Sequence, residues 1–163
     1  MRKSLLAISL GSLLLGTALA YWTPALMAQA TRSAKLAPHT QANLPPLNIP
    51  TYKLPKSPDA IRAIYRFAAE HPEVLGYMPC FCSCEQLGHT SNDECFVKTR
   101  AKNGDVTEWQ DHGMVCAMCL AVGETAMKMS ADGKSVRDIR AEVERKYASQ
   151  TEFRTPTPTP PKG

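Results

Sequence analysis

The sequence predicts a small, mainly α-helical domain that contains three helices, a cysteine-rich loop and a short β-hairpin. Apolar residues recur at helical spacing near residues 58–70 and again near residues 135–147, which favours a helix at each end of the domain. An Asn103-Gly104 pair between two short runs of β-prone residues is typical of a hairpin turn. All six cysteines of the chain lie between residues 80 and 119, in the middle of this pattern.

The first predicted helix begins at Ser57 and Pro58, because serine is a good N-cap and proline is favoured in the first helical turn. It runs to about Glu70, where His71-Pro72 ends it, since the residue before a proline is disfavoured in the helical conformation. Its apolar residues at helical spacing are Ile61, Ile64, Tyr65 and Ala68.

Two further helices and the hairpin complete the predicted domain. The hairpin pairs residues 95–97 with residues 106–109, and the second helix covers residues 114–129. Ser135 and Asp138 resemble a capping box at the start of the third helix. These elements give a modest core for about 90 residues, and such a small domain benefits from a covalent or metal staple. The apolar stripe of the third helix is Val136, Ile139, Val143 and Tyr147.

The N-terminal segment has the pattern of an export signal. Arg2 and Lys3 precede an uncharged, largely apolar stretch at residues 5–20, and small residues at cleavage-site spacing follow it. Residues 1–30 are therefore predicted to be a signal peptide or, if uncleaved, an N-terminal membrane anchor. Both interpretations place the domain outside the cytoplasm, in contact with a membrane only in the second case.

Proline-rich segments flank the predicted domain. Residues 31–58 contain six prolines, and proline lacks the N–H donor that helices and inner strands require, so residues 31–56 are predicted to be an extended linker. The threonine and proline repeat at the C-terminus predicts a disordered tail over residues 150–163. The folded domain is accordingly expected at residues 57–149.

Several function classes are excluded by what the sequence lacks. The net charge of +4 comes without any run of lysine or arginine interleaved with aromatic residues, so the sequence does not predict nucleic-acid binding. The sequence contains no glycine-rich phosphate loop, no G-x-S-x-G and no H-E-x-x-H motif. The chemistry of the chain is therefore expected to lie in its cysteines.

The cysteines form two closely spaced groups. Cys80, Cys82 and Cys84 make a C-x-C-x-C run, and in an extended segment alternate side chains share a face, so the three sulfurs are expected to point toward one site. Cys116 and Cys119 make a C-x-x-C motif on the second predicted helix, where the i,i+3 spacing places both thiols on one side. The two groups are expected to meet in space.

Two histidines and one further cysteine complete the candidate site. His112 lies four residues before Cys116 and joins the same helical stripe if the helix extends that far back, while His89 lies in the loop between the two groups. Six thiols and two imidazoles give eight ligands, the number that two four-coordinate centres need. Soft thiolate ligands favour Cu(I), with zinc as the alternative. The predicted ligands are Cys80, Cys82, Cys84, Cys95, Cys116, Cys119, His89 and His112.

The order and spacing of these residues resemble the PCYCGC-motif family, which consists of small exported proteins or lipoproteins of bacteria. The resemblance covers about residues 57–147 and implies a location in the bacterial periplasm or on the outer face of the cytoplasmic membrane. It also implies a cysteine-centred site, and it implies no particular reaction. The segments that carry it are Pro79-Cys80-Phe81-Cys82-Ser83-Cys84, His89, Cys95-Phe96, Trp109…His112-Gly113…Cys116-x-x-Cys119 and Ser135…Ile139-Arg140…Tyr147.

The chain departs from the family pattern at two places. Phe81 and Ser83 replace the tyrosine and the glycine of the namesake motif, which affects the conformation of the loop more than its sulfur chemistry. Residues 14–17 read Leu-Leu-Gly-Thr and resemble a lipobox in which threonine stands where the lipidated cysteine would be.

Three functional hypotheses compete. The first is an exported protein that binds Cu(I), or zinc, for storage, buffering or delivery to or from another envelope metalloprotein. The second is a structural or interaction domain stapled by up to three disulfides, for which six cysteines allow 15 pairings. The third is a thiol–disulfide redox protein that uses the C-x-x-C pair at a helix start. The C-x-C-x-C run favours the first, because disulfides between its adjacent cysteines would close small, strained rings.

Overall fold

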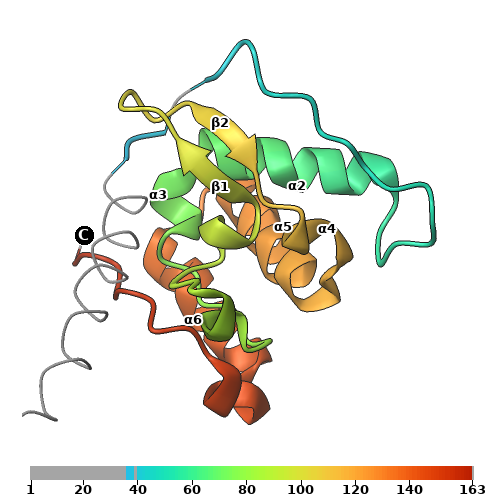
Figure 1. Cartoon of the computed structure of the whole chain (residues 1–163). Helices are drawn as coiled ribbons and strands as arrows, with labels where there is room; N and C mark the ends of the chain where they lie inside the picture. The colour runs from blue at the N-terminus through green and yellow to red at the C-terminus, as the bar shows by residue number, and fades with distance from the viewer. Residues whose placement is uncertain (1–35, 39, 163) are drawn as a thin grey trace, which may run out of the picture.

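The computed structural model describes residues 36–38 and 40–162 of the 163-residue chain (Figure 1). The predicted signal peptide or membrane anchor at residues 1–30 lies outside the described residues. Within the described part, no helix combines the length and the apolar character needed to cross a bilayer.

The first helix is confirmed. Helix α2 (Pro58–Glu70) begins after Ser57, whose side chain accepts a hydrogen bond from the Ala60 N–H at 3.3 Å, as expected of an N-cap. The chain leaves this helix at His71 and forms the short helix α3 (Pro72–Leu75). The predicted apolar stripe of α2 is buried, so this helix is one wall of the core.

The predicted hairpin is also present. Strand β1 (Val97–Arg100) pairs antiparallel with strand β2 (Val106–Trp109), and Val97 lies opposite Trp109. The hairpin begins two residues later than the predicted start at Cys95, because a 3-10 turn, η2 (Asp93–Cys95), occupies that position. The strands therefore start just beyond the cysteine-rich loop and extend away from it.

The second predicted helix is in fact two helices, so the prediction of one continuous helix over residues 114–129 is wrong. Helix α4 (His112–Val115) ends at Cys116, and helix α5 (Ala117–Ala131) begins directly after it. Cys116 has φ −93° and ψ 105°, an extended conformation that breaks the helix. Its sulfur accepts a hydrogen bond from the Cys119 N–H at 3.3 Å and so takes the place of the usual N-cap oxygen.

The third helix, α6 (Val136–Lys146), begins at the predicted cap. The Ser135 hydroxyl accepts from the Asp138 N–H at 3.2 Å and donates to the Asp138 carboxylate at 2.7 Å. Ile139 and Val143 of its stripe are fully buried against α5. The mainly α-helical fold with one hairpin is thus confirmed.

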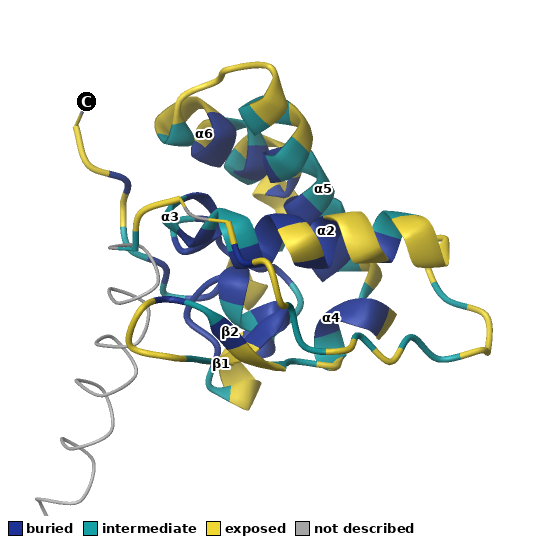
Figure 2. Cartoon of the chain, turned by 90° about the horizontal axis from the view of Figure 1, so that it is seen from above, coloured by how far each residue is buried: buried dark blue, intermediate teal, exposed yellow. Residues whose placement is uncertain are grey.

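The core lies between α2, α5, α6 and the hairpin. Helix α5 packs against both α2 and α6, and Figure 2 shows that each of these helices turns its buried face inward and its exposed face outward. Tyr65 on α2 makes edge-to-face contacts with Phe96 and Trp109 at centroid distances of 5.2 and 5.5 Å. Its hydroxyl donates to the Gln110 carbonyl at 2.6 Å, which satisfies its buried polar group.

The segments that flank the helical domain, predicted to be an extended linker and a disordered tail, make contacts with it. Gln41 is buried and exchanges two hydrogen bonds with the Val106 backbone, at 2.7 and 3.0 Å, while the Trp109 indole donates to the Pro45 carbonyl at 2.9 Å. At the other end, a 3-10 helix, η3 (Ala148–Phe153), leads into the Thr/Pro segment. In Figure 1 the N-terminal flank arches past the hairpin and the outer side of α2, and the C-terminal flank runs past α6.

Candidate metal centre

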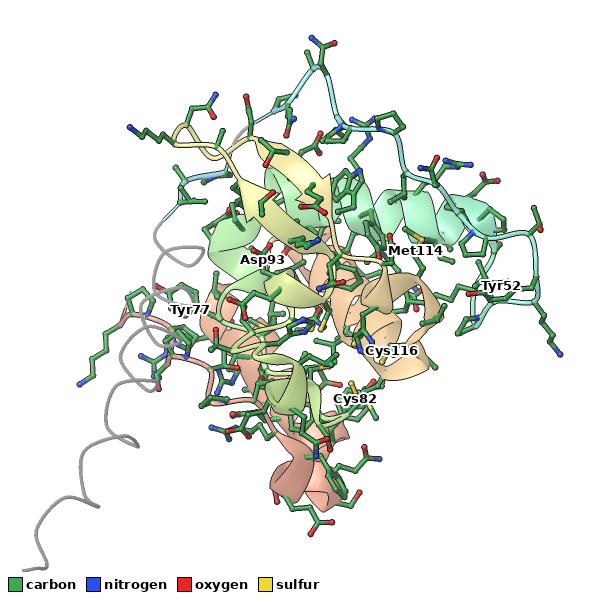
Figure 3. All side chains as sticks on the ribbon, viewed as in Figure 1. Tyr52, Tyr77, Cys82, Asp93, Met114 and Cys116 are labelled. Atoms are coloured by element: carbon green, nitrogen blue, oxygen red, sulfur yellow. The ribbon has the colours of Figure 1, made fainter. Side chains whose placement is uncertain are left out.

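The cysteine loop, helix α4 and helix α5 bring all eight predicted site residues into one region, here called the cysteine cluster. Figure 3 shows the labelled side chains of Cys82 and Cys116 side by side, where the loop meets these helices, and their sulfurs are 3.3 Å apart. The cluster consists of Cys80, Cys82, Cys84, Cys95, Cys116, Cys119, His89 and His112.

The C-x-C-x-C run is a turn and not the extended segment that was predicted. Among the described residues, Ser83 is the one residue other than glycine with a positive φ, at 60° with ψ 25°. This left-handed conformation reverses the chain, so that the sulfurs of Cys82 and Cys84 lie 3.0 Å apart and Cys80 lies 3.3 Å from Cys82. The three sulfurs converge, as predicted, through a different backbone geometry.

Cys119 occupies the centre of the cluster. It lies in the first turn of α5, is fully buried, and its sulfur is within 3.7 Å of four other sulfurs. The helix break at Cys116 turns that side chain toward Cys82 instead of along the helix surface. The contacts of the Cys119 sulfur are Cys80 at 3.4 Å, Cys82 at 3.6 Å, Cys84 at 3.7 Å and Cys95 at 3.3 Å.

Both histidines lie at the edge of the thiol group. The His112 Nε2 atom is 3.4 Å from the Cys84 sulfur, and the His89 Nδ1 atom is 3.6 Å from the Cys95 sulfur. Gly113 makes the first contact possible, because a Cβ atom there would lie 2.4 Å from the Cys95 carbonyl oxygen. Only glycine allows α4 to approach the cysteine loop so closely.

The two ends of the cluster differ in exposure. The inner end, defined as Cys84, His89 and Cys95, is buried, with exposed fractions of 1%, 5% and 0%. The outer end, defined as Cys82, His112 and Cys116, is partly exposed at every residue. Cys80 and Cys119 lie buried between the two ends. The cluster is therefore open to solvent on one side.

The thiols have divergent acidities because each proton is shared among neighbouring sulfurs. Hydrogen bonds from Cys119 and then Cys82 lower the pKa of the Cys116 thiol to about 2. Hydrogen bonds with neighbouring thiols, of which the one with Cys119 has the largest effect, also hold the pKa of Cys84 well below its usual value. Burial raises the pKa of Cys95 to about 11. Some sulfurs are thus stabilised as thiolates, while their neighbours keep protons that a cation can replace.

The C-terminal segment is hydrogen-bonded to the backbone of the cysteine loop, a contact that the sequence did not predict. The Thr155 hydroxyl accepts from the Cys80 N–H at 2.9 Å, and the Thr155 N–H donates to the Cys80 carbonyl at 2.9 Å. The Thr157 hydroxyl donates to the Thr90 carbonyl at 2.6 Å. No signal in the composition reveals these contacts, because threonine and proline repeats are also typical of disordered segments.

A buried arginine on α6 also holds the cysteine loop and the C-terminal segment together, and its position in the sequence could have revealed this role. Arg140 donates to the carbonyls of Tyr77, just before the cysteine loop, and of Pro158 in the tail. It lies one helical turn from Val136 and Val143 on the apolar stripe of α6, where a charged residue needs buried partners. Its position on the stripe could have identified it as a residue that binds backbone carbonyls.

The sulfur separations suit metal ligands better than disulfides. All six cysteines are free, and the sulfur–sulfur distances of 3.0 to 3.7 Å exceed the bond length of about 2.05 Å in a disulfide. A tetrahedral zinc centre with bonds of about 2.3 Å separates its sulfurs by about 3.8 Å. In the part of the chain that the structure describes, three groups could hold a metal ion: Cys80, Cys82, Cys84 and Cys119; Cys82, His112, Cys116 and Cys119; and Cys84, His89 and Cys95.

Fold and site together define a small helix-rich domain built around one thiol and imidazole cluster that could hold a metal ion. The family model described as proteins of unknown function with a PCYCGC motif matches residues 28–161, and the chain belongs to that family. The match extends over the packed linker and the Thr/Pro tail as well as the helical domain. Comparisons with curated proteins and with solved structures gave no match.

The motif that names the family has a physical explanation at one position. When P-C-Y-C-G-C is placed on residues 79–84, its glycine falls on Ser83, the residue in the left-handed conformation. Glycine adopts this conformation without the steric cost that other residues meet. In this chain, the position of the motif's glycine is thus the position of the turn that brings the three cysteines together.

Proposed function

We propose that this protein is an extracytoplasmic soft-metal-binding protein that holds Cu(I) for storage, buffering or delivery. The observation that carries the proposal is the cysteine cluster itself, in which six thiols and two imidazoles form three groups whose ligand atoms lie within 4.8 Å of one another. Thiolates are the protein ligands that soft ions such as Cu(I) prefer. The export-like pattern of residues 1–30 supports a location outside the cytoplasm.

The inner end of the cluster favours Cu(I) over zinc. Cys84, His89 and Cys95 offer three ligand atoms within 4.8 Å of one another, and all three residues are buried. Structural zinc is almost always bound by four ligands, so a buried three-ligand group leaves it one short. Cu(I) accepts three ligands, and zinc remains the alternative metal for the four-ligand groups.

The outer end offers a route for exchange with a partner. Cys116 is partly exposed and its lowered pKa keeps it a thiolate, so it is ready to accept a metal ion. In one exchange step, a copper–sulfur bond to the donor breaks as a bond to Cys116 forms, and copper stays Cu(I) throughout. A second envelope metalloprotein with exposed thiolates is the expected donor or acceptor.

The proposal is tested by titrating the reduced chain with Cu(I) under anaerobic conditions and recording native and denaturing mass spectra with thiol alkylation. We expect bound copper in the wild type, and loss of most of it in a Cys82→Ser, Cys116→Ser double variant. Ser83→Ala, which changes the same loop without removing a thiol, is the control and should keep its copper. Three disulfides with no metal in the wild type, or full copper in the double variant, would contradict the proposal.

A second candidate is a thiol–disulfide redox protein, favoured by the position of Cys116 at the N-terminus of α5. The Cys116 thiolate would attack a substrate disulfide, and the Cys119 thiol would resolve the mixed disulfide. The chain would end with one disulfide and the substrate with two thiols. Against this, Cys119 is fully buried. Reduction of insulin disulfides by the metal-free protein would favour this function over metal binding.

A further inference from the structure

We propose that the cysteine cluster binds several Cu(I) ions as one thiolate-bridged cluster, in place of the two separate four-coordinate centres that the ligand count suggests. This inference rests on the proposed metal-binding function and deepens it. Cys82, Cys84 and Cys119 are assigned as bridging ligands, each bound to two ions. The remaining five residues are terminal ligands, each bound to one ion.

The sharing of sulfurs among the candidate groups carries this assignment. The central group of Cys80, Cys82, Cys84 and Cys119 has Cys82 and Cys119 in common with the outer group that contains His112 and Cys116. The central group also has Cys84 in common with the inner group of His89 and Cys95. The three groups therefore form a series in which neighbouring positions are joined by at least one sulfur.

Distances between the groups favour shared sulfurs over a division into two independent centres. The Cys119 sulfur is 3.4 Å from Cys80 and equally close, at 3.3 Å, to Cys95 of the inner end. The sulfur of Cys84, an inner-end residue, is 3.0 Å from the Cys82 sulfur and 3.4 Å from the His112 Nε2 atom. It therefore contacts two residues of the outer end. A thiolate has lone pairs for two metal ions, whereas an imidazole nitrogen has one. The sulfurs in the middle are thus the atoms able to bridge.

Binding through all of the buried cysteines as thiolates calls for more than one cation. Cys80, Cys84, Cys95 and Cys119 are all at most 1% exposed, and a buried thiolate is strongly disfavoured unless a positive charge offsets it. One Cu(I) ion offsets one thiolate charge only. A cluster of several ions, each shared among sulfurs, distributes the positive charge over the whole buried region.

Native mass spectrometry and copper X-ray absorption of the fully loaded full-length protein test the inference. We expect more than one copper per chain, a copper–copper scattering shell, and the luminescence of polynuclear Cu(I)–thiolate centres. One copper per chain, or several without copper–copper scattering, would overturn the bridged cluster and leave the proposed function intact. Absence of any bound copper would instead reject the proposed function.

A matched pair of variants distinguishes bridging from terminal sulfurs. Cys82 and Cys116 are both partly exposed and lie 3.3 Å apart, yet only Cys82 is assigned as a bridge. We expect Cys82→Ser to bind at least one copper fewer than Cys116→Ser and to show weaker copper–copper scattering. Far-UV circular dichroism of each variant shows that its helices are retained. Equal copper content and equal scattering in the two variants would overturn the assignment.

Discussion

At the inner end of the cysteine cluster, Cys84, His89 and Cys95 are buried beneath the loop, whereas at the outer end Cys82, His112 and Cys116 are each partly exposed. The two ends have the same chemistry, since each offers thiols and one imidazole. They differ in the access that solvent and a partner have to them. Under the proposed function, candidate ligands of one kind would retain metal at the inner end and exchange it at the outer end.

The difference has its origin in which elements supply each end. The inner end comes from the loop and the 3-10 turns η1 (Cys84–Leu87) and η2, which the hairpin and the C-terminal tail cover. The outer end comes from the break between α4 and α5, which lies at the surface. Substitutions that alter only one end test whether the two ends behave differently.

The largest expected contrast is in thiol reactivity. In the reduced, metal-free protein at pH 6, Cys116 should be alkylated at least about 100-fold faster than Cys95, because only thiolates react. The pKa of Cys116 is lowered to about 2, so its reactivity should not decline as the pH falls from 8 to 5. Burial raises the pKa of Cys95 to about 11, so that thiol stays protonated throughout this range.

Iodoacetamide labelling followed by peptide mass spectrometry measures both rates in one sample. Urea-unfolded protein is the control, and there the two cysteines should react alike because the folded environment is lost. Equal rates in the folded protein would show that the two ends are not distinguished by their access and acidity.

A substitution at Gly113 should disturb the contact between the two ends. A Cβ atom at this position would lie 2.4 Å from the Cys95 carbonyl oxygen and 2.6 Å from a ring carbon of Phe96. We expect Gly113→Ala to lower the free energy of unfolding by about 2 kcal/mol, as overpacking does. Displacement of His112 should also weaken Cu(I) binding about tenfold.

Urea denaturation of the metal-free protein and competition with a Cu(I) chelator measure these two effects. Val115→Ala is the control, since Val115 lies on the same short helix and is 46% exposed. Its stability should change by less than about 0.5 kcal/mol. A Gly113→Ala variant as stable as this control would show that α4 is free to move away from the loop.

The smallest expected effect is at Ser83, which joins Cys82 of the outer end to Cys84 of the inner end. Its left-handed conformation, with φ 60°, is unfavourable for a residue with a Cβ atom. Ser83→Gly should therefore raise the free energy of unfolding by about 1 kcal/mol and leave the copper content unchanged. Thermal unfolding of the metal-free protein measures the gain, and Ser83→Ala, which keeps the Cβ atom, should show none.

Much of the fold could be predicted from local sequence signals. Ser57-Pro58, Ser135 and Asn103-Gly104 each specify a helix start or a turn through contacts within a few residues. The two helices therefore begin where expected, and the hairpin is present with its first strand shifted by two residues. The proximity of the two cysteine groups was also predictable, because six cysteines within 40 residues of a small domain are expected to lie close together in space.

The features that could not be predicted depend on contacts between distant residues. The break at Cys116 replaces helical hydrogen bonds with a sulfur cap and a contact to Cys82, which no local pattern reveals. The docking of Thr155 on Cys80 spans 75 positions in the chain, and its hydroxyl becomes informative only once that partner is known. Helical propensity and composition reflect local preferences only, so they cannot predict features that long-range contacts decide.

Because the C-terminal segment is hydrogen-bonded to the cysteine loop, the geometry of the cysteine cluster depends on where the chain ends. A chain cut before Thr155 would keep every cysteine and histidine but would expose the Cys80 and Thr90 backbone groups that this segment now satisfies. Trimming by a carboxypeptidase, or fusion of a purification tag at this end, would thus act directly on the support of the cysteine loop. Thr155, Thr157 and Pro158 are therefore part of the scaffold that holds the cysteine loop in place.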